Sequence, residues 1–169
     1  ILKWDGSNWL AQSSGTTQPL YGIWGTDAHN IWVVGQNGVI LKWDGSAWNP
    51  QVSGTANSLN AVWGTDTNHI WVVGQAGVTL KWDGSAWLLQ DSGTANALYD
   101  VWGIGASNIW AVGQAGTILK WDGYTWGAQS SGTLNPLSGV WAMDANNVWV
   151  VGQSGTVLKW DGNVWNTQD

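Results

Sequence analysis

Residues 31–48 read IWVVGQNGVILKWDGSAW, and this stretch decides the fold. Side chains alternate between the two faces of a strand, so Ile31 and Val33 face one way while Trp32 and Val34 face the other. Both faces are therefore apolar, whereas a sheet with one solvated face would alternate apolar and polar residues. We expect a strand within a sheet that is covered on both sides.

The same stretch recurs with a constant period of 39 residues. A fixed period of about 20 to 50 residues is typical of solenoids, propellers and arrays. The period divides the chain into a half repeat, 1–13, and four repeats, 14–52, 53–91, 92–130 and 131–169. We expect a single domain or a fragment of a longer array, since the sequence begins within a repeat. The tetrapeptide Lys-Trp-Asp-Gly, which marks the period, begins at Lys3, Lys42, Lys81, Lys120 and Lys159.

One repeat contains four short apolar runs separated by Gly, Asn, Asp and Ser. In the first repeat these runs predict strand A at 20–24, strand B at 31–35, strand C at 39–43 and strand D at 47–51. Radially stacked four-stranded sheets cover each other's faces. A parallel β-helix would need shorter coils, and a sandwich would not hold a constant period. We therefore predict an all-β fold: a β-propeller of four-stranded antiparallel blades, with four complete blades plus an extra C–D half blade.

The composition excludes several classes of function. The chain has 18 Trp and 24 Gly, no Cys, no Arg and no Glu, and a net charge of -6. Without clustered Lys and Arg we expect neither nucleic-acid binding nor attraction to anionic membranes. Without Cys there is no disulfide, zinc-thiolate site or thiol nucleophile. No apolar stretch approaches the roughly 18 residues that span a bilayer, so membrane insertion is not expected.

The Trp-Asp-Gly turn resembles two propeller signatures. Trp43 and Asp44 occupy the place of the Trp-Asp dipeptide of WD40 repeats, and residues 44–48 are similar to the Asp-box of bacterial neuraminidase-like (BNR) repeats. The Gly-His pair of WD40 repeats is absent, and Gly45 falls one place early for an Asp-box. The whole pattern most resembles the Trp-rich bacterial propellers grouped with BNR-like and Ycf48-like repeats, over all 169 residues. The resemblance implies the fold, but such propellers host many functions.

The Asp of each Trp-Asp-Gly turn is expected to be structural. Its carboxylate can accept hydrogen bonds from backbone N–H groups two residues on and so close the C–D turn. His29 and His69 are the only imidazoles and are expected to lie in loops. No residues are spaced for a zinc or calcium site or a Ser-His-Asp triad, so we expect no metal, no cofactor and no catalytic residue. The turn residues are Asp5, Asp44, Asp83, Asp122 and Asp161.

Two repeated side chains are candidates for ligand binding. The Trp that opens the outermost strand D can stack an indole face on a sugar, and the Gln after strand B can bond sugar hydroxyls. Packing of these indoles between blades is the favoured interpretation, and a lectin that binds glycans in inter-blade clefts is the alternative. A glycan-processing enzyme with paired Asp is a more distant alternative. The candidates are Trp9, Trp48, Trp87, Trp126 and Trp165, with Gln36, Gln75, Gln114 and Gln153.

Both ends of the sequence fall in the same phase, because 1–13 and 157–169 both form a C–D hairpin. Four blades could close and leave a hairpin over, or five could close with one A–B pair missing. Either arrangement exposes an unpaired strand edge, which is a template for association. We expect a secreted or cell-surface scaffold that self-associates and binds glycan or protein partners multivalently. An assembly-factor role like that of Ycf48-like proteins is less favoured, because a basic patch is missing.

Overall fold

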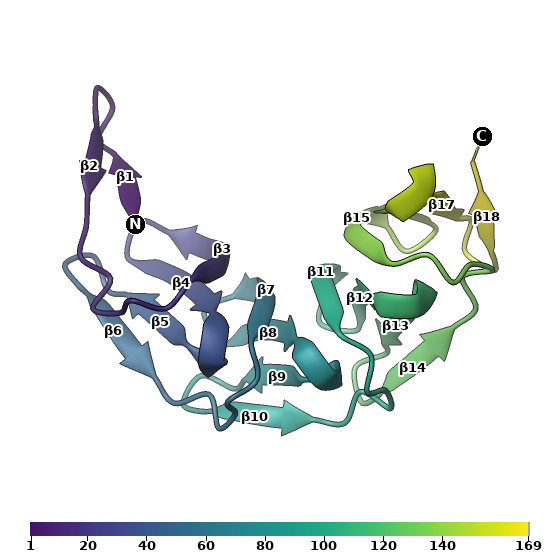
Figure 1. Cartoon of the computed structure of the whole chain (residues 1–169), viewed down its shortest axis with the longest axis horizontal. Coiled ribbons are helices and arrows are strands. Elements are labelled where there is room, and N and C mark those ends of the chain that lie inside the picture. The colour runs from purple at the N-terminus through teal and green to yellow at the C-terminus, as the bar shows by residue number, and fades with distance from the viewer. Residues whose placement is uncertain (169) are drawn as a thin grey trace.

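The computed structural model describes residues 1–168, which form short antiparallel strands joined by tight turns (Figure 1). The last residue of the expected fourth repeat, Asp169, lies outside the described residues. An N-terminal hairpin of β1 (Leu2–Trp4) and β2 (Trp9–Ala11) precedes four four-stranded sheets, here called blades 1 to 4. Within residues 1–168, no helix has the length and apolar character needed to cross a bilayer.

Each blade contains strands A to D in chain order. Blade 1 contains β3 (Leu20–Asp27), β4 (Asn30–Gly35), β5 (Ile40–Trp43) and β6 (Trp48–Gln51). Blade 2 contains β7 (Leu59–Asp66), β8 (His69–Gly74), β9 (Thr79–Trp82) and β10 (Trp87–Gln90). Blade 3 contains β11 (Leu98–Gly105), β12 (Asn108–Gly113), β13 (Ile118–Trp121) and β14 (Trp126–Gln129). Blade 4 contains β15 (Leu137–Asp144), β16 (Asn147–Gly152), β17 (Val157–Trp160) and β18 (Trp165–Thr167).

The predicted architecture of four blades plus a half blade is confirmed, because four sheets are antiparallel meanders of four strands and β1 and β2 form a two-stranded sheet. Strand A is longer than predicted and runs to Asp27, since its pairing with β4 continues across a register shift after Gly25. Strand C begins one residue later than predicted. There Val39 closes the preceding turn by donating its N–H to the Gln36 carbonyl at 3.2 Å.

The turn between strands B and C requires glycine. In the first blade this is η1 (Gln36–Gly38), where Asn37 and Gly38 have φ of 57° and 73°, the left-handed region that glycine adopts at little cost. A Cβ at Gly38 would also overlap the Thr55 carbonyl oxygen in the loop that leads to blade 2. The turn of one blade therefore packs against the loop that starts the next.

Apolar residues form a layer between each pair of neighbouring blades. In blade 2, Ile70 and Val72 face blade 1, while Trp71 and Val73 face blade 3. The strand-B indoles of the first three blades are among the largest fully buried side chains. The central strands of blades 2 and 3 are thus covered on both apolar faces, because each of these blades lies between two others.

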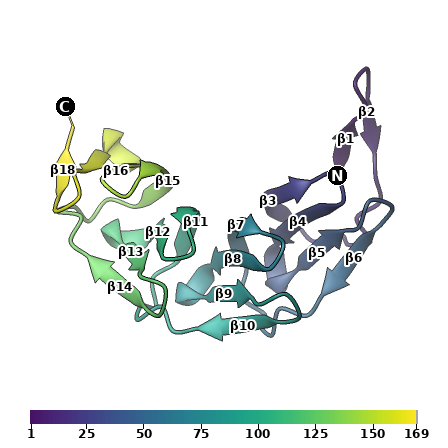
Figure 2. The same cartoon turned by 180° about the vertical axis from the view of Figure 1, so that it is seen from behind.

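The blades follow one another in an arc whose ends lie apart (Figure 1 and, from behind, Figure 2). The β1–β2 hairpin continues the arc as the outer half of a further blade position before blade 1. There the Trp48 Nε1–H donates to Gln12 Oε1 at 3.3 Å, just as Trp165 of blade 4 donates to Gln129 of blade 3 at 2.9 Å. The inner half of that position, where strands A and B would lie, holds no described residue of the chain.

Candidate functional site

A cleft lies between the C–D hairpin of blade 1 and the end of β2. It has a volume of about 490 Å³, with Gln12, Ser13 and Gly15 on one side and Trp43 and Trp48 on the other. The two indoles have centroids 5.3 Å apart and planes tilted by 47°. An aromatic wall facing a few amide and hydroxyl groups is the usual lining of a small-molecule site.

The same cleft recurs at blade 4 with a volume of about 430 Å³. Gln129 and Ser130 line one side, and Trp160 and Trp165 line the other. The indole centroids are 5.4 Å apart and the planes are tilted by 47°. The clefts at blades 1 and 4 are therefore two copies of one site that share the Gln, Ser and two Trp side chains, whereas Ser46 and Ala47 of the first are replaced by Asn163 and Val164 in the second.

The strand-D indole is buried in the two middle blades. Trp87 and Trp126 are each 8% exposed, and their Nε1 atoms find no hydrogen-bond partner among the described residues. The Gln51 and Gln90 amides, which would correspond to Gln129, donate instead to carbonyls of their own strands. Accessible indoles of this series are therefore concentrated towards the ends of the arc.

The glutamines predicted to bind ligand lie in the B–C turns, away from these indoles. They begin η1 and its counterparts η2 (Gln75–Gly77), η3 (Gln114–Gly116) and η4 (Gln153–Gly155). In blade 3, Gln114 Oε1 accepts the Ala97 N–H at 3.4 Å. The B–C turns and the Trp-Asp-Gly turns lie at opposite ends of the strands, so the structure does not bring the two predicted series together.

The glutamine that reaches the indole is instead the one that ends strand D. The Gln12–Trp48 and Gln129–Trp165 pairs are both separated by 36 residues, so the contact always crosses from one repeat to the next. Sequence reasoning missed this residue, although its recurrence is visible in the repeat. The series consists of Gln12, Gln51, Gln90, Gln129 and Gln168.

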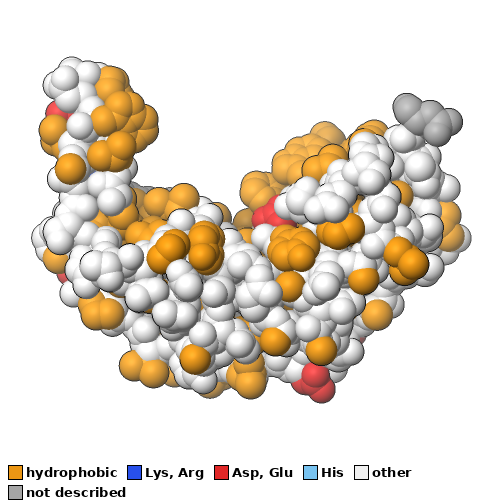
Figure 3. All heavy atoms as spheres, viewed as in Figure 1, with side chains coloured by type: hydrophobic (Ala, Val, Ile, Leu, Met, Phe, Trp, Pro, Cys, Tyr) orange, Lys and Arg blue, Asp and Glu red, His pale blue; other side chains and the backbone are white. Residues whose placement is uncertain are grey.

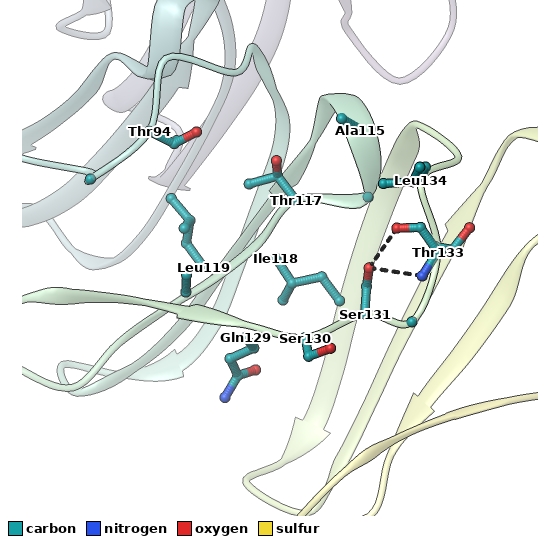
Figure 4. A pocket seen from close by; sticks show the side chains of 14 residues that line it. Thr94, Ala115, Thr117, Ile118, Leu119, Gln129, Ser130, Ser131, Thr133 and Leu134 are labelled. Atoms are coloured by element: carbon teal, nitrogen blue, oxygen red, sulfur yellow. Dashed lines mark hydrogen bonds between the residues drawn. The ribbon is translucent and has the colours of Figure 1, made fainter.

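A second cavity, of about 540 Å³, lies beside blade 3 at the end that carries the B–C turns (Figure 4). Its lining includes Thr94, Thr117, Ser131 and Thr133 around the apolar side chain of Ile118. Ser131 Oγ donates to the Thr133 carbonyl at 3.1 Å and accepts the Thr133 N–H at 3.3 Å. The Ser131 hydroxyl thus closes the loop after strand D, while the Thr117 hydroxyl donates to the Gln114 carbonyl of the B–C turn. None of the lining residues is a carboxylate, a histidine or a lysine.

Each Trp-Asp-Gly turn is closed by its carboxylate. Asp44 Oδ1 accepts the N–H groups of Ser46 at 2.8 Å and Ala47 at 2.9 Å. These bonds favour the ionised form, and together with the Ser46 hydroxyl they hold the pKa of Asp44 well below its ordinary value. The same pair of backbone bonds lowers the pKa of Asp5, Asp83, Asp122 and Asp161.

Asp100 departs from this pattern. It lies on the inner strand of blade 3, where its Oδ2 accepts the Val140 N–H of blade 4 and its Oδ1 accepts the Val101 N–H, both at 2.9 Å. Burial raises the pKa of Asp100, while the two backbone hydrogen bonds oppose the shift. The other blades have Gly or Ala at this position, so Asp100 adds one inner-strand tie between blades 3 and 4.

Acidification is expected to destabilise the protein below about pH 4. The turn carboxylates, such as Asp44, have lowered folded-state pKa values, so their stabilisation is complete above the unfolded-state pKa and is lost as the pH falls through the folded-state value. Asp100, with a raised pKa, acts in the opposite sense, because its contribution is lost as the pH rises through the folded-state value. The turn carboxylates outnumber it, so melting temperatures should fall between about pH 5 and about pH 2.

The control for this pH series is Asp44→Asn, which keeps an oxygen acceptor in the turn but does not titrate. Its melting temperature should fall less steeply with acidification than that of the unaltered chain. A melting temperature that stays constant or rises as the pH is lowered would contradict the prediction.

His29 lies in the exposed A–B turn of blade 1, as expected, whereas His69 is the exposed first residue of β8, where it pairs with Asp66. His69 Nδ1 is 2.9 Å from the Asp66 carboxylate, and His29 Nδ1 is 3.9 Å from that of Asp27. Across residues 1–168, no three His, Cys, Asp or Glu side chains converge on a common point. The polar contacts of both histidines are thus with the carboxylate that ends strand A of their own blade, and the His29 ring also lies beside Gly45 of the C–D turn.

The two ends of the arc expose positions that are buried in its interior. Ile23 of blade 1 is 63% exposed, whereas the equivalent Val62 of blade 2 is 7% exposed. In blade 4, Trp141 is 49% exposed and Val151 is 47% exposed. Figure 3 shows apolar side chains on both sides of the opening of the arc. The side of blade 1 with Ile23 and Gly25 is here called the entry face, and the side of blade 4 with Trp141 and Val151 the exit face.

No protein-family model matches the sequence, and no curated protein matches it significantly. Among solved structures, the chain is similar to one described as YCF48 bound to D1 peptide, with a TM-score of 0.74, 20% sequence identity, and coverage of 98% of this chain and 58% of that one. YCF48 from Cyanidioschyzon merolae matches with a TM-score of 0.69 and 19% identity, over 90% of this chain and 56% of that one. The chain thus spans less than three-fifths of either structure, and at these identities the likeness shows the propeller fold.

Proposed function

We propose that this chain is a non-catalytic propeller scaffold that binds macromolecular partners and self-associates through its incomplete ends. The observation that carries the proposal is the pair of apolar end faces, where Ile23 and Trp141 lie exposed although equivalent positions elsewhere are packed between blades. Contiguous exposed apolar surface of this kind marks interaction sites. The free edge of β1 adds unpaired backbone groups, which are a template for strand pairing.

A protein partner is supported by the likeness to a propeller that was solved with a peptide. An extended peptide can add to an exposed sheet edge, and β1 offers such an edge to a partner of this chain. The net charge of -6 and the absence of Arg favour a neutral or basic segment over an acidic one.

Sedimentation equilibrium over a range of micromolar concentrations tests the self-association. The 18.2 kDa chain should give an average mass above that of a single copy, and the mass should rise with concentration. Irreversible aggregation would also raise the average mass, so the control is that dilution of the sample restores the lower mass. One species of single-chain mass at every concentration would overturn the proposed self-association.

Glycan binding is a second candidate function, which the paired clefts at blades 1 and 4 favour. Each combines two indoles with a glutamine and a serine, the side chains that stack on a sugar ring and bond its hydroxyls. Calorimetric titration of the glycans that respond on an array should show saturable binding that Trp48→Ala weakens. Tyr124→Ala, at an exposed aromatic side chain outside the cleft linings, is the control. A flat array response would remove this candidate.

A further inference from the structure

The three junctions between blades within the chain share a contact that always runs in the same direction along the arc. The strand-A indole of each blade lies against a small residue that follows the strand-A indole of the next blade. A Cβ at Gly64 would come within 2.8 Å of the Trp24 ring, and one at Gly103 within 2.6 Å of the Trp63 ring. At the last junction the Trp102 Nε1–H donates to the Ala142 carbonyl at 3.2 Å. The pairs are therefore Trp24–Gly64, Trp63–Gly103 and Trp102–Ala142.

The exit face carries the indole of this contact, and the entry face carries its small residue. Trp141 is 49% exposed because no described blade packs against it. Gly25 is exposed, and a Cβ there would meet atoms of its own blade only. The neighbouring position repeats the asymmetry, since Ile23 is 63% exposed while Val62 and Val140 are 7% and 6% exposed. The two faces are thus the separated halves of the contact that joins blades within the chain.

We propose that a second copy of the chain docks head-to-tail, so that Trp141 of its exit face lies over Gly25 of the entry face. This inference rests on the proposed self-association and specifies its geometry. Strands β15 and β16 of the second copy would fill the inner half of the blade position whose outer half holds β1 and β2. The side chains of Ile23, Trp141 and Val151 carry no charge, so the docked surfaces themselves need not overcome repulsion.

The docked blade brings its own outer strands, so one hairpin must give way. β17 is paired with β16 along a ladder from Val148–Trp160 to Val151–Val157. The β1–β2 hairpin reaches blade 1 through the Gln12–Trp48 hydrogen bond and through Lys3, whose Nζ lies 5.3 Å from the Trp43 ring centroid. A backbone ladder outweighs one side-chain hydrogen bond and one exposed cation–π contact. The β1–β2 hairpin is therefore the element that leaves.

The contact is heterologous, because two different faces meet. Such contacts form a closed ring when the rotation from each copy to the next returns to the first copy, and they form an open filament when it does not. Two copies of a four-bladed chain give eight blades, which lies within the range of about 4 to 8 blades typical of propellers. A two-copy ring is the smallest assembly that buries both faces of every chain.

Two full-length variants test this geometry, each altering one face. Trp141→Glu alters the exit face, and Ile23→Lys alters the entry face. Either change should weaken self-association by at least about thirty-fold, the effect of losing an interface hot spot. Tyr124→Ser, at a side chain 87% exposed in a C–D turn, is the control and should associate like the unaltered chain. Far-UV circular dichroism at dilutions that give single chains should show the same fold for all three.

Mixing the two face variants separates head-to-tail docking from any other association. Each variant keeps one intact face, so the mixture should form dimers with one junction although neither variant associates alone. Gln12→Ala, which loosens the β1–β2 hairpin, should tighten association of the otherwise unaltered chain.

Each contrary outcome overturns a defined part of the inference. A mixture that stays monomeric, or face variants that associate as the unaltered chain does, would overturn the head-to-tail geometry while leaving self-association in place. Association unchanged or weakened by Gln12→Ala would overturn the displacement of the hairpin. A monomeric unaltered chain would instead overturn the proposed self-association itself.

Discussion

Trp71→Ala is expected to lower the free energy of unfolding by about 3 to 5 kcal/mol, as truncation of a fully buried Trp typically does. Trp71 in β8 is 1% exposed and lies in the layer between blades 2 and 3. Its ring centroid is 4.5 Å from that of Trp121 and 5.4 Å from that of Trp126, the second contact being edge-on. Alanine would leave a cavity between two stiff sheets that can close it only in part.

The matched control is Trp149→Ala, at the same repeat position in blade 4. Lys159 Nζ lies 5.3 Å from the Trp149 ring, the distance that Lys81 Nζ keeps from Trp71, so the two sites share their cation–π contact. Trp149 is only half-buried, because no described blade covers this side of blade 4. Its truncation should cost about half as much or less, since the cost scales with buried area. Urea unfolding followed by far-UV circular dichroism, at concentrations that keep the chains single, measures the free energy of unfolding of both variants. Equal losses for the two variants would contradict the assigned inter-blade packing.

Gly77→Ala should also lose about 3 to 5 kcal/mol, through left-handed backbone strain combined with a steric overlap. Gly77 in η2 has φ of 71°. A Cβ there would overlap the Thr94 carbonyl oxygen and would lie 3.0 Å from Ser92 Oγ. The loop that leads from blade 2 to blade 3 would have to move away, and its packing against the turn would be lost.

The chain offers a close control in Gly155, the equivalent residue of blade 4. Its φ is also 71°, but no described atom of a following loop lies within 4 Å of a Cβ placed there. Gly155→Ala should therefore cost about 1 kcal/mol, the backbone strain alone. Chemical denaturation gives the loss in free energy of unfolding for each variant, and the difference between the two losses measures the contact between turn and loop. A difference near zero would refute the close approach at Gly77.

The fold is predictable because separate features of the repeat agree with one another. The two-faced strand at 31–34 needs cover on both sides, and the constant period supplies identical sheets to provide it. Strand ends were less predictable: β3 continues to Asp27 and β5 begins after Val39. The β3–β4 ladder continues across a register shift, and a backbone hydrogen bond of the B–C turn fixes the start of β5; neither feature is visible in the apolar runs of the sequence.

The candidate site is predictable only in part, because repeats share a sequence but not their neighbours. Trp9 and Trp87 open equivalent strands, yet they are 65% and 8% exposed, since one lies at the end of the arc and the other inside it. The partner of the cleft indole also comes from the preceding repeat. A search within one repeat selects Gln36, whereas the residue that contacts Trp48 is Gln12.

The indole-over-glycine junction joins each blade to its immediate neighbours and to nothing farther along the arc. Stability in such arrays is approximately a sum of unit and nearest-neighbour terms. Unequal recombination that adds or removes one unit of 39 residues therefore leaves every remaining junction with the partners it had before. A gene of this kind can lengthen or shorten over evolutionary time without compensating substitutions elsewhere in the product.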